Sequence, residues 1–514
     1  MTWGYHRLPA RLRWWLERRT LWAVCGVLVA YGWLLSDYIP EDIASYFWSK
    51  PYFLGRDCWF TNYADRPTDC GYLVVEEERS TGSAVVKLPV VIFRSTADVV
   101  RPDPIVFING GPGATTLASP KITGKMWAEL LPEIDWISGR DLILFEQRGV
   151  GLSQPPLRCS EFRNVSPNPH EFEQIHELMQ RCRDRLRQQG VRLTAYNTTA
   201  IAQDVEDLRT ALGIEQWNLW GESYGSHVAL AILRNSSSGV RSAVLSGVVP
   251  PNVEDRTETV TGFYRVLEQV FAACAEDLAC NGAYPNLAVK FAAIVERLRI
   301  KPVKIRTRLT RLGKNKTFLV DDAFFIELVF NSLYDTPGVA KLPSLIDDFV
   351  RGLNNPWDAL IDDWDFALFS PFDSMGMAES VVCNDAGVDG VQTSPELLRD
   401  YPLLKSWIVW LEGWSGCKYW PVSADSALDR TAVSSDVPTL LLAGAYDPAT
   451  PVLWAQRAAK TLSNGHLFVF PGRSHDASDD PCAKKLIFGF LENPEERPLE
   501  DCLSDLGPPS FLTP

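Results

Sequence analysis

The segment Gly221–Ser226 has the composition of a nucleophilic site. It reads Gly-Glu-Ser-Tyr-Gly-Ser, between a short aromatic-rich apolar segment, 216–220, and an apolar segment, 227–233, that is typical of a buried helix. A Gly-x-Ser-x-Gly motif between a strand and a helix predicts a nucleophile elbow, a strained turn around which strand and helix approach closely. The motif also occurs by chance in glycine-rich loops. A nucleophilic Ser223 therefore requires a base, an acid and an oxyanion site elsewhere in the chain.

A serine hydroxyl becomes an effective nucleophile when a histidine removes its proton and a carboxylate orients that histidine. Beyond the elbow helix two histidines remain: His466 opens an apolar run, and His475 lies in the loop directly after it. Active sites of open α/β sheets collect beyond the carboxyl ends of strands, which favours His475 as the base. Asp447 follows the apolar run 438–444 and is favoured as the acid. Asp476 is its rival, and helix capping is the structural alternative for Asp447.

The oxyanion that develops on a substrate needs backbone N–H donors. Tyr224, directly after Ser223, supplies one amide. The loop 109–113, Asn-Gly-Gly-Pro-Gly, follows an early apolar run, where the second donor is expected, and we assign that donor to Gly111. Taken alone, this loop would predict only a turn. His227, four positions after Ser223, is expected to pack under the elbow.

Short continuous apolar runs would position these residues. Such runs form strands that are buried on both faces of a sheet, and they occur at 104–108, 141–145, 216–220, 242–247, 438–444 and 466–470. Helical patterns such as 198–212 separate them, so the series is β-α-β with parallel strands. Two earlier apolar runs, 70–75 and 84–93, predict a pair of antiparallel strands at the start of the sheet. The fold class is therefore α/β, with a mostly parallel, doubly wound sheet.

The alternation of strands and helices stops between residues 250 and 437. Helical patterns dominate there, with one hairpin-like stretch at 303–320. Because strands resume at 438, we predict one sheet domain, 58–249 and 438–514, with a largely helical lid insertion at 250–437. Within the sheet domain, Arg148 is expected to brace neighbouring loops through a carboxylate.

The N-terminal residues predict a membrane segment. Residues 1–19 contain five arginines, and residues 20–36 contain no charged side chain. This uncharged length is at the lower edge of what spans a bilayer, so a signal anchor and a cleaved signal peptide are both open. Because no Ala-x-Ala-like site follows, we predict a basic cytoplasmic segment at 1–19, an uncleaved anchor at 20–37 and a linker at 38–57. The catalytic domain would then be periplasmic or extracellular, or secreted if the segment is cleaved.

Composition limits the partners and the compartment. The net charge is −14 and basic residues form no long run outside the N-terminus, which argues against nucleic acid as a partner. No Cys-x-x-Cys or His-Glu-x-x-His spacing occurs, so we expect no metal site, and no motif predicts a cofactor. Ten cysteines lie outside the apolar N-terminal segment, which predicts five disulfides in an oxidising compartment, with free buried thiols as the alternative. The expected pairs are sequence neighbours: Cys58–Cys70, Cys159–Cys182, Cys274–Cys280, Cys383–Cys417 and Cys482–Cys502.

Five segments between about Cys58 and Cys502 together resemble the proline iminopeptidase and tripeptidyl aminopeptidase branch of the α/β-hydrolases. The resemblance implies exopeptidases that act on a free N-terminus, with Ser223, Asp447 and His475 as the triad and a helical lid over the site. It also implies an exported protein with a cysteine-bearing, TAP-like C-terminal region. The segments are the glycine loop 110–113, the Gln-Arg-Gly-Val-Gly-Leu-Ser turn 147–153, the elbow 221–226, and the surroundings of Asp447 and His475.

An aminopeptidase must hold a cationic α-amine, which calls for an acidic group near the nucleophile. The segment 380–385 resembles a family segment whose acidic residue faces the site, so Asp385 is the predicted substrate-binding residue, with a solvated lid carboxylate as the alternative. The predicted function is an exported serine hydrolase, an aminopeptidase that acts on small peptides. One alternative is a carboxylester hydrolase or lipase, which uses the same parts. Another is a catalytically silent α/β-hydrolase ectodomain used for binding.

Overall fold

The structure is a computed structural model that describes residues 51–60, 66–79, 84–117, 139–253, 255–353, 355–386, 393–414, 416–422 and 429–514. The predicted basic segment 1–19 and the predicted anchor 20–37 lie outside these ranges. No helix within the ranges is both long enough and apolar enough to cross a membrane.

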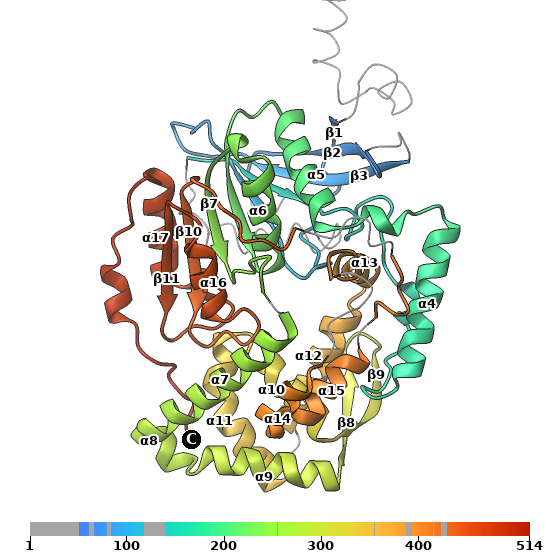
Figure 1. Cartoon of the computed structure of the whole chain (residues 1–514), viewed down its shortest axis with the longest axis vertical. Helices are drawn as coiled ribbons and strands as arrows, with labels where there is room; N and C mark the ends of the chain where they lie inside the picture. Colours follow the sequence, from blue (N-terminus) through green and yellow to red (C-terminus); the bar gives the residue numbers. More distant parts are fainter. Residues whose placement is uncertain are drawn as a thin grey trace, which may run out of the picture.

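A nine-stranded sheet forms the centre of the molecule (Figure 1). The three strands at one edge are antiparallel to their neighbours, and the other six run parallel to one another. This arrangement confirms the predicted α/β class with a mostly parallel sheet. In spatial order the strands are β1 (Tyr52–Arg56), β2 (Thr68–Glu76), β3 (Val85–Phe93), β5 (Leu142–Phe145), β4 (Ile105–Ile108), β6 (Trp217–Glu222), β7 (Val240–Ser246), β10 (Thr439–Gly444) and β11 (Gly465–Phe470).

Strand β1 corrects the predicted linker at 38–57. It pairs along its whole length with β2, from Tyr52 opposite Val74 to Arg56 opposite Cys70. Leu54 is the one fully buried residue of this strand. An edge strand with so little buried surface lacks the continuous apolar run that marks a central strand, and its sequence therefore resembles a linker.

Helices cover both faces of the sheet (Figure 1). On one face, α5 (Thr198–Ala211), α6 (Tyr224–Asn235) and α16 (Val452–Ala459) share a core with Leu441 of β10. On the opposite face, α17 (Pro481–Glu492) packs in a core with Leu440 and Leu442. Neighbouring leucines of one strand thus face opposite layers, as the pleat requires.

Residues 250–437 are called the inserted region below. Most of their described part forms a second layer beyond the carboxyl edge of the parallel strands (Figure 1), whereas Met377, Trp420 and Val433 pack into the core of the sheet domain. The core of the second layer is rich in phenylalanine and tryptophan. A separate antiparallel hairpin, β8 (Val303–Leu309) and β9 (Lys314–Val320), occupies the stretch predicted as a hairpin. The helices are α7 (Asp255–Glu276), α8 (Leu278–Ala283), α9 (Leu287–Ile300), α10 (Asp322–Ser332), α11 (Thr336–Arg351), α12 (Asn355–Phe369), α13 (Met375–Ala386), α14 (Pro395–Asp400) and α15 (Lys405–Gly413).

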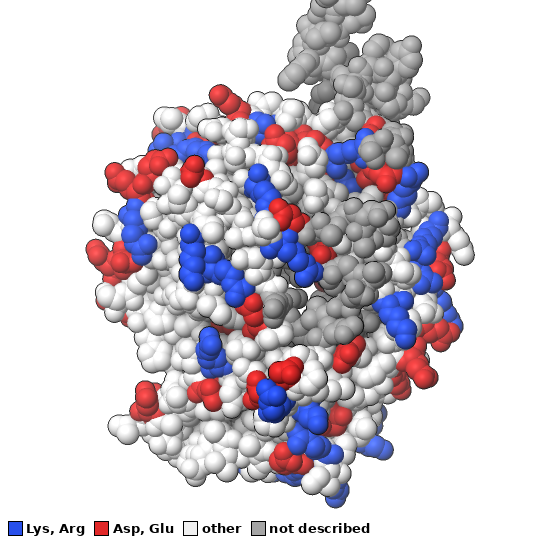
Figure 2. Space-filling model, viewed as in Figure 1, with Lys and Arg blue, Asp and Glu red and all other residues white. Residues whose placement is uncertain are grey.

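The C-terminal tail connects the sheet domain to the inserted region. After α17 the chain runs down to α11, where the Leu512 amide donates to the carbonyl of Ala340 and Phe511 packs against the aromatic core. Figure 1 shows the C-terminus beside α8 and α11. On the face drawn in Figure 2, Lys and Arg side chains are interspersed with Asp and Glu, so the net negative charge is not gathered into one patch there.

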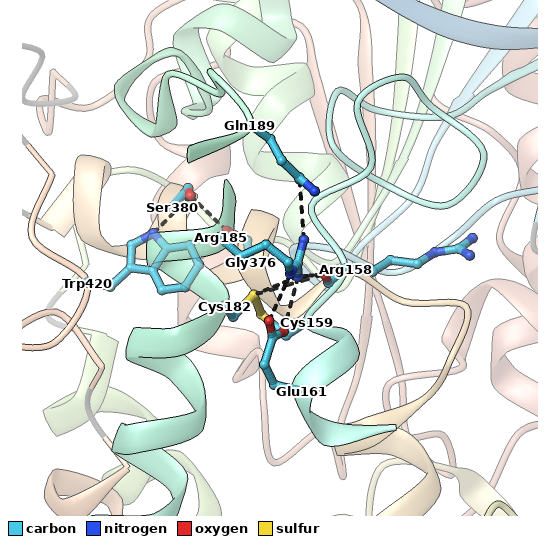
Figure 3. The surroundings of a disulfide bond; sticks show 9 residues. All are labelled: Arg158, Cys159, Glu161, Cys182, Arg185, Gln189, Gly376, Ser380 and Trp420. Carbon is cyan, nitrogen blue, oxygen red and sulfur yellow. Dashed lines mark hydrogen bonds and ion pairs between the residues drawn. A yellow bond between two sulfur atoms is a disulfide. The ribbon is translucent and has the colours of Figure 1, made fainter. Parts of the chain in front are cut away.

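All five predicted disulfides are present, with the predicted pairing. Figure 3 shows Cys159–Cys182, which ties the start of the 3₁₀ turn η3 (Ser160–Phe162) to α4 (Phe172–Gln188). Beside it, Arg185 donates through Nε to Glu161 at 2.8 Å. Disulfides form and persist in oxidising compartments, so these bonds support the predicted export.

Candidate active site

Ser223 occupies the turn between β6 and α6 with φ of 53° and ψ of −123°, a backbone conformation that non-glycine residues rarely adopt. Glycine is required at positions 221 and 225, because a side chain at either position would clash with neighbouring backbone atoms. A Cβ on Gly221 would lie 2.6 Å from the Gly225 oxygen, and one on Gly225 would lie 1.9 Å from the Ile108 oxygen. Ser226 braces the turn, because its hydroxyl donates to the Ser223 carbonyl at 2.6 Å. The predicted strand, tight turn and helix are therefore present, with strain concentrated at the serine.

His475 and Asp447 meet at the same edge of the sheet. His475 Nδ1 lies 2.7 Å from Asp447 Oδ2. The amides of Ala449 and Thr450 donate to Asp447 Oδ1 at 2.9 and 2.8 Å, and the Thr450 hydroxyl donates to Oδ2. Burial alone would lower the pKa of His475, but the Asp447 carboxylate raises it, and the net direction is upward. Asp447 is thus held rigidly where it favours the imidazolium.

The inserted region holds the loop that carries His475. The His475 amide donates to the Tyr334 carbonyl at 3.2 Å, and the Ser474 amide donates to Thr336 Oγ1 at 3.1 Å. Thr336 in turn donates its amide and its hydroxyl to Asp476, at 3.1 and 2.6 Å. Asp476, the rival acid, is therefore bonded to Thr336 at the start of α11. The contacts of residues 474–476 with 334–336 are called the loop clamp below.

A pocket of about 280 Å³ opens above Ser223. Gly111, the predicted oxyanion residue, is in its wall with φ of 108°, which a glycine adopts without strain. Tyr224 is the first residue of α6, so its amide is among those with no partner inside the helix. The lining residues are Asn109, Gly110, Gly111, Glu222, Ser223, Ser246, Tyr334 and His475.

Asp385 is not among the residues that line this pocket. Its Oδ2 accepts from the Thr198 hydroxyl at 2.6 Å, and that hydroxyl also lies 2.8 Å from the Tyr224 phenol oxygen. Burial, as the largest cause, raises the pKa of Asp385 to about 6. The geometry links Asp385 to the far side of Tyr224, so its contact with a substrate amine stays a prediction.

Three further side chains were assigned supporting or peripheral roles from the sequence. Arg148 is fully buried and forms a paired hydrogen bond with Asp204, at 2.6 and 2.7 Å, which confirms its bracing role. His227 packs under the elbow, with Nδ1 3.0 Å from the Val249 carbonyl oxygen. His466 lies on β11, where its ring packs edge-on against Phe490 of α17.

Four residues at the site were not predicted from the sequence: Glu222, Ser246, Tyr334 and Thr450. Glu222 lies inside the elbow motif and Ser246 ends the next strand, so the rule that sites collect at strand ends would have found both. Thr450 is three residues after Asp447, a spacing at which side chains often bond their neighbours. No local sequence pattern marks Tyr334 as a site residue, because it reaches the pocket from the inserted region.

Two family models match this chain. The first, described as the alpha/beta hydrolase fold, matches residues 103–288, which include Ser223. The second, described as TAP-like protein, matches residues 408–502, which include Asp447 and His475. This chain is an α/β-hydrolase with a TAP-like C-terminal region.

Curated relatives of this α/β-hydrolase are similar over most of their length. Serine protease Hip1 of Mycobacterium tuberculosis is 25% identical over 462 residues, covering 82% of this chain and 84% of that protein. Carboxylesterase B of the same species is 28% identical over 437 residues, with 77% of each chain covered. Tripeptidyl aminopeptidase of Streptomyces lividans is 23% identical over 436 residues, covering 77% of this chain and 75% of that protein.

Proposed function

We propose that this α/β-hydrolase is an exported serine aminopeptidase that releases N-terminal residues or short peptides from small peptide substrates. The observation that carries the proposal is the hydrogen bond of His475 to Asp447 beside Ser223, whose backbone is held in the strained elbow conformation. The TAP-like region and the names of two relatives, a serine protease and a tripeptidyl aminopeptidase, favour peptides as substrates.

In the proposed mechanism the hydroxyl oxygen of Ser223 attacks the carbonyl carbon of the scissile bond, and His475 takes the hydroxyl proton. Asp447 holds His475 in the tautomer with a proton on Nδ1 and stabilises the imidazolium. The amides of Gly111 and Tyr224 donate to the oxyanion. His475 then gives its proton to the leaving nitrogen as the C–N bond breaks, which leaves an acyl-enzyme. Water, deprotonated by His475, hydrolyses the ester and restores Ser223.

The inserted region has two proposed roles. Tyr334 brings an aromatic side chain to the pocket wall, where it would contact substrate. The loop clamp fixes His475, so the same region that covers the site also positions the base. Because the loop clamp joins the inserted region to the His475 loop, we propose that this region limits the size of substrates while remaining attached to that loop.

Ester hydrolysis is the second candidate function. The same catalytic triad and oxyanion amides can cleave esters, and similarity to carboxylesterase B favours this candidate. The catalytically silent alternative has less support, because Ser223, His475 and Asp447 are all present and grouped.

The test compares chromogenic aminoacyl and tripeptidyl substrates, with free and blocked N-termini, and simple esters, with Ser223→Ala as the control. The proposal expects hydrolysis of free-amine peptide substrates, loss of activity on blocked ones, and no turnover by Ser223→Ala. Cleavage of esters alone, or indifference to blocking, would contradict it.

Export and membrane attachment are proposed on separate grounds. The five disulfides fit an oxidising compartment, whereas the anchor at 20–37 rests on its sequence. Membrane fractionation of the full chain and of a chain that begins at residue 38 tests the anchor. The full chain is expected in the membrane fraction and the shortened chain outside it. Equal distribution of the two would contradict the anchor.

A further inference from the structure

Two polar side chains beside Ser223 have unused hydrogen-bonding capacity. Glu222 of β6 and Ser246 of β7 are register partners on neighbouring parallel strands, so their side chains share one face of the sheet, and both line the pocket. Ser246 is 2% exposed, and its hydroxyl has no hydrogen-bond partner among the described residues. Buried hydroxyls are almost always hydrogen-bonded, so this one, in a pocket wall, is available for a ligand contact.

The hydrogen bonds of Glu222 fall on one of its two oxygens. Trp220 Nε1 and the Ser478 hydroxyl both donate to Oε1, at 3.1 and 2.9 Å, and no residue that the structure describes donates to Oε2. A carboxylate accepts through both oxygens, whereas a neutral carboxyl has one accepting oxygen and one O–H donor. Oε2 therefore has hydrogen-bonding capacity left for a ligand in the pocket, and it can donate when the carboxyl is neutral.

The surroundings of Glu222 shift the pKa of its carboxyl upward, which extends the neutral form to higher pH. Burial is the largest influence on the Glu222 carboxyl and raises its pKa. Of the charged groups that face it, Asp479 raises the pKa further and His475, when protonated, lowers it. The two donors on Oε1 also lower the pKa, and the net direction is upward.

Glu222 is joined to the chain segment that follows His475, the residue that would protonate the leaving group, and both line the pocket. Ser478, its hydrogen-bond donor, belongs to η8 (Ala477–Asp479), which begins two residues after His475. His475 returns the proton to the leaving nitrogen, so the first leaving residue must lie against this wall. The α-carboxylate of a single leaving residue is attached to the carbon next to that nitrogen, within the same part of the pocket.

We propose that Glu222 and Ser246 form a subsite that donates hydrogen bonds to the free α-carboxylate of the leaving residue. The favoured substrates are then dipeptides and other short peptides whose scissile bond precedes the last residue. A pocket of about 280 Å³ is at the small end for ligand sites, which suits a leaving group of one residue. The subsite rests on the proposed function, because it assumes that Ser223 and His475 cleave a peptide bond.

The experiment measures kcat/KM for three substrates: alanyl-alanine, its C-terminal amide, and alanyl-p-nitroanilide. Wild type should prefer the free acid over the amide by about tenfold to a hundredfold, the range for a hydrogen bond to a charged group. Glu222→Ala should abolish this preference and Ser246→Ala should reduce it. Glu222→Gln should retain it, because the amide NH₂ still donates.

The pH dependence separates the glutamine variant from wild type. A neutral Glu222 is present below its pKa and lost as the pH rises through it, so the wild-type preference for the free acid should decline with rising pH. The preference of Glu222→Gln should not decline. Glu215→Gln, on the exposed approach to the same strand, is the matched control and should behave as wild type.

Three outcomes overturn the subsite. Equal cleavage of the acid and the amide by wild type, with alanyl-p-nitroanilide still cleaved, rejects the subsite and leaves the aminopeptidase proposal standing. Loss of discrimination between free and blocked N-termini in Glu222→Gln means that Glu222 is ionised and binds the amine instead. Failure to cleave any of the three substrates rejects the subsite, and failure to cleave tripeptidyl substrates with free N-termini as well rejects the aminopeptidase function.

Discussion

The sheet domain and the inserted region supply the two sides of the pocket in different ways. On the sheet side, Ser223, Gly111 and Asp447 each follow a strand directly, so short stretches of chain fix their positions. On the inserted side, Tyr334 and Thr336 come from a layer with its own aromatic core; Tyr334 lines the pocket, and both take part in the loop clamp. The proposed chemistry therefore resides in the sheet domain, while its precise alignment depends on long-range bonds to the inserted region.

Asp447→Asn tests the sheet side and has the largest expected effect. The asparagine keeps the shape but favours the wrong tautomer of His475, so kcat should fall by on the order of 10⁴-fold. Steady-state kinetics with thermal unfolding as a fold check measures this. Asp505→Asn, an exposed carboxylate on η9 (Asp501–Asp505), is the control. A loss of less than tenfold would reject Asp447 as the partner of His475.

Thr336→Val tests the inserted side through the loop clamp. It removes the hydroxyl bonds to Asp476 and Ser474, so kcat should fall about tenfold on peptides and on esters alike, because the base is misplaced. Thr310→Val is a matched control. The amide and hydroxyl of Thr310 bond Asp362 in the same way, at 2.7 and 2.6 Å, far along the inserted region. Equal effects of the two variants would show that the clamp does not position His475.

The pH profile of kcat/KM reports His475. Its pKa is raised, and the base must be neutral, so activity should rise with pH through a value above the ordinary 6.5 or so of histidine. In Asp447→Asn the residual activity should rise at a lower pH, because the carboxylate that raises the pKa is gone. If the midpoint of the pH profile is the same in the variant as in wild type, the Asp447 carboxylate is not what raises the pKa of His475.

Asp385→Asn has the smallest expected effect and decides between two roles. A raised pKa of about 6 means that the fold favours neutral Asp385, so this group destabilises the protein increasingly as the pH rises from about 4 to 6. The variant should lose that pH dependence of Tm. Its activity should change a few-fold on all substrates if Asp385 supports Tyr224, and only on free-amine substrates if it binds the amine. Glu379→Gln, on the same helix with a pKa of about 7, is the activity control.

The sheet side could be predicted because its signals are local. Buried runs such as 438–444 mark strands, and Asp447 and His475 are the polar residues that follow them. Asp447 was favoured over Asp476 from the sequence, but the contact that holds Asp476 elsewhere could not be predicted, since Thr336 bonds Asp476 from an element 140 residues away in sequence. Strand β1 was missed because an edge strand with one buried side chain leaves no clear pattern. The surroundings of Asp385 were missed because its partner, Thr198, lies on another helix.

Covalent labelling tests the central claim most directly. Native protein is treated with a fluorophosphonate probe, digested and analysed by mass spectrometry, with Ser223→Ala and Asp447→Asn in parallel. The proposed roles predict rapid labelling of wild type at Ser223, much slower labelling of Asp447→Asn, and none at this site in Ser223→Ala. Absence of labelling in wild type, or a label on a different residue, would contradict Ser223 as the nucleophile.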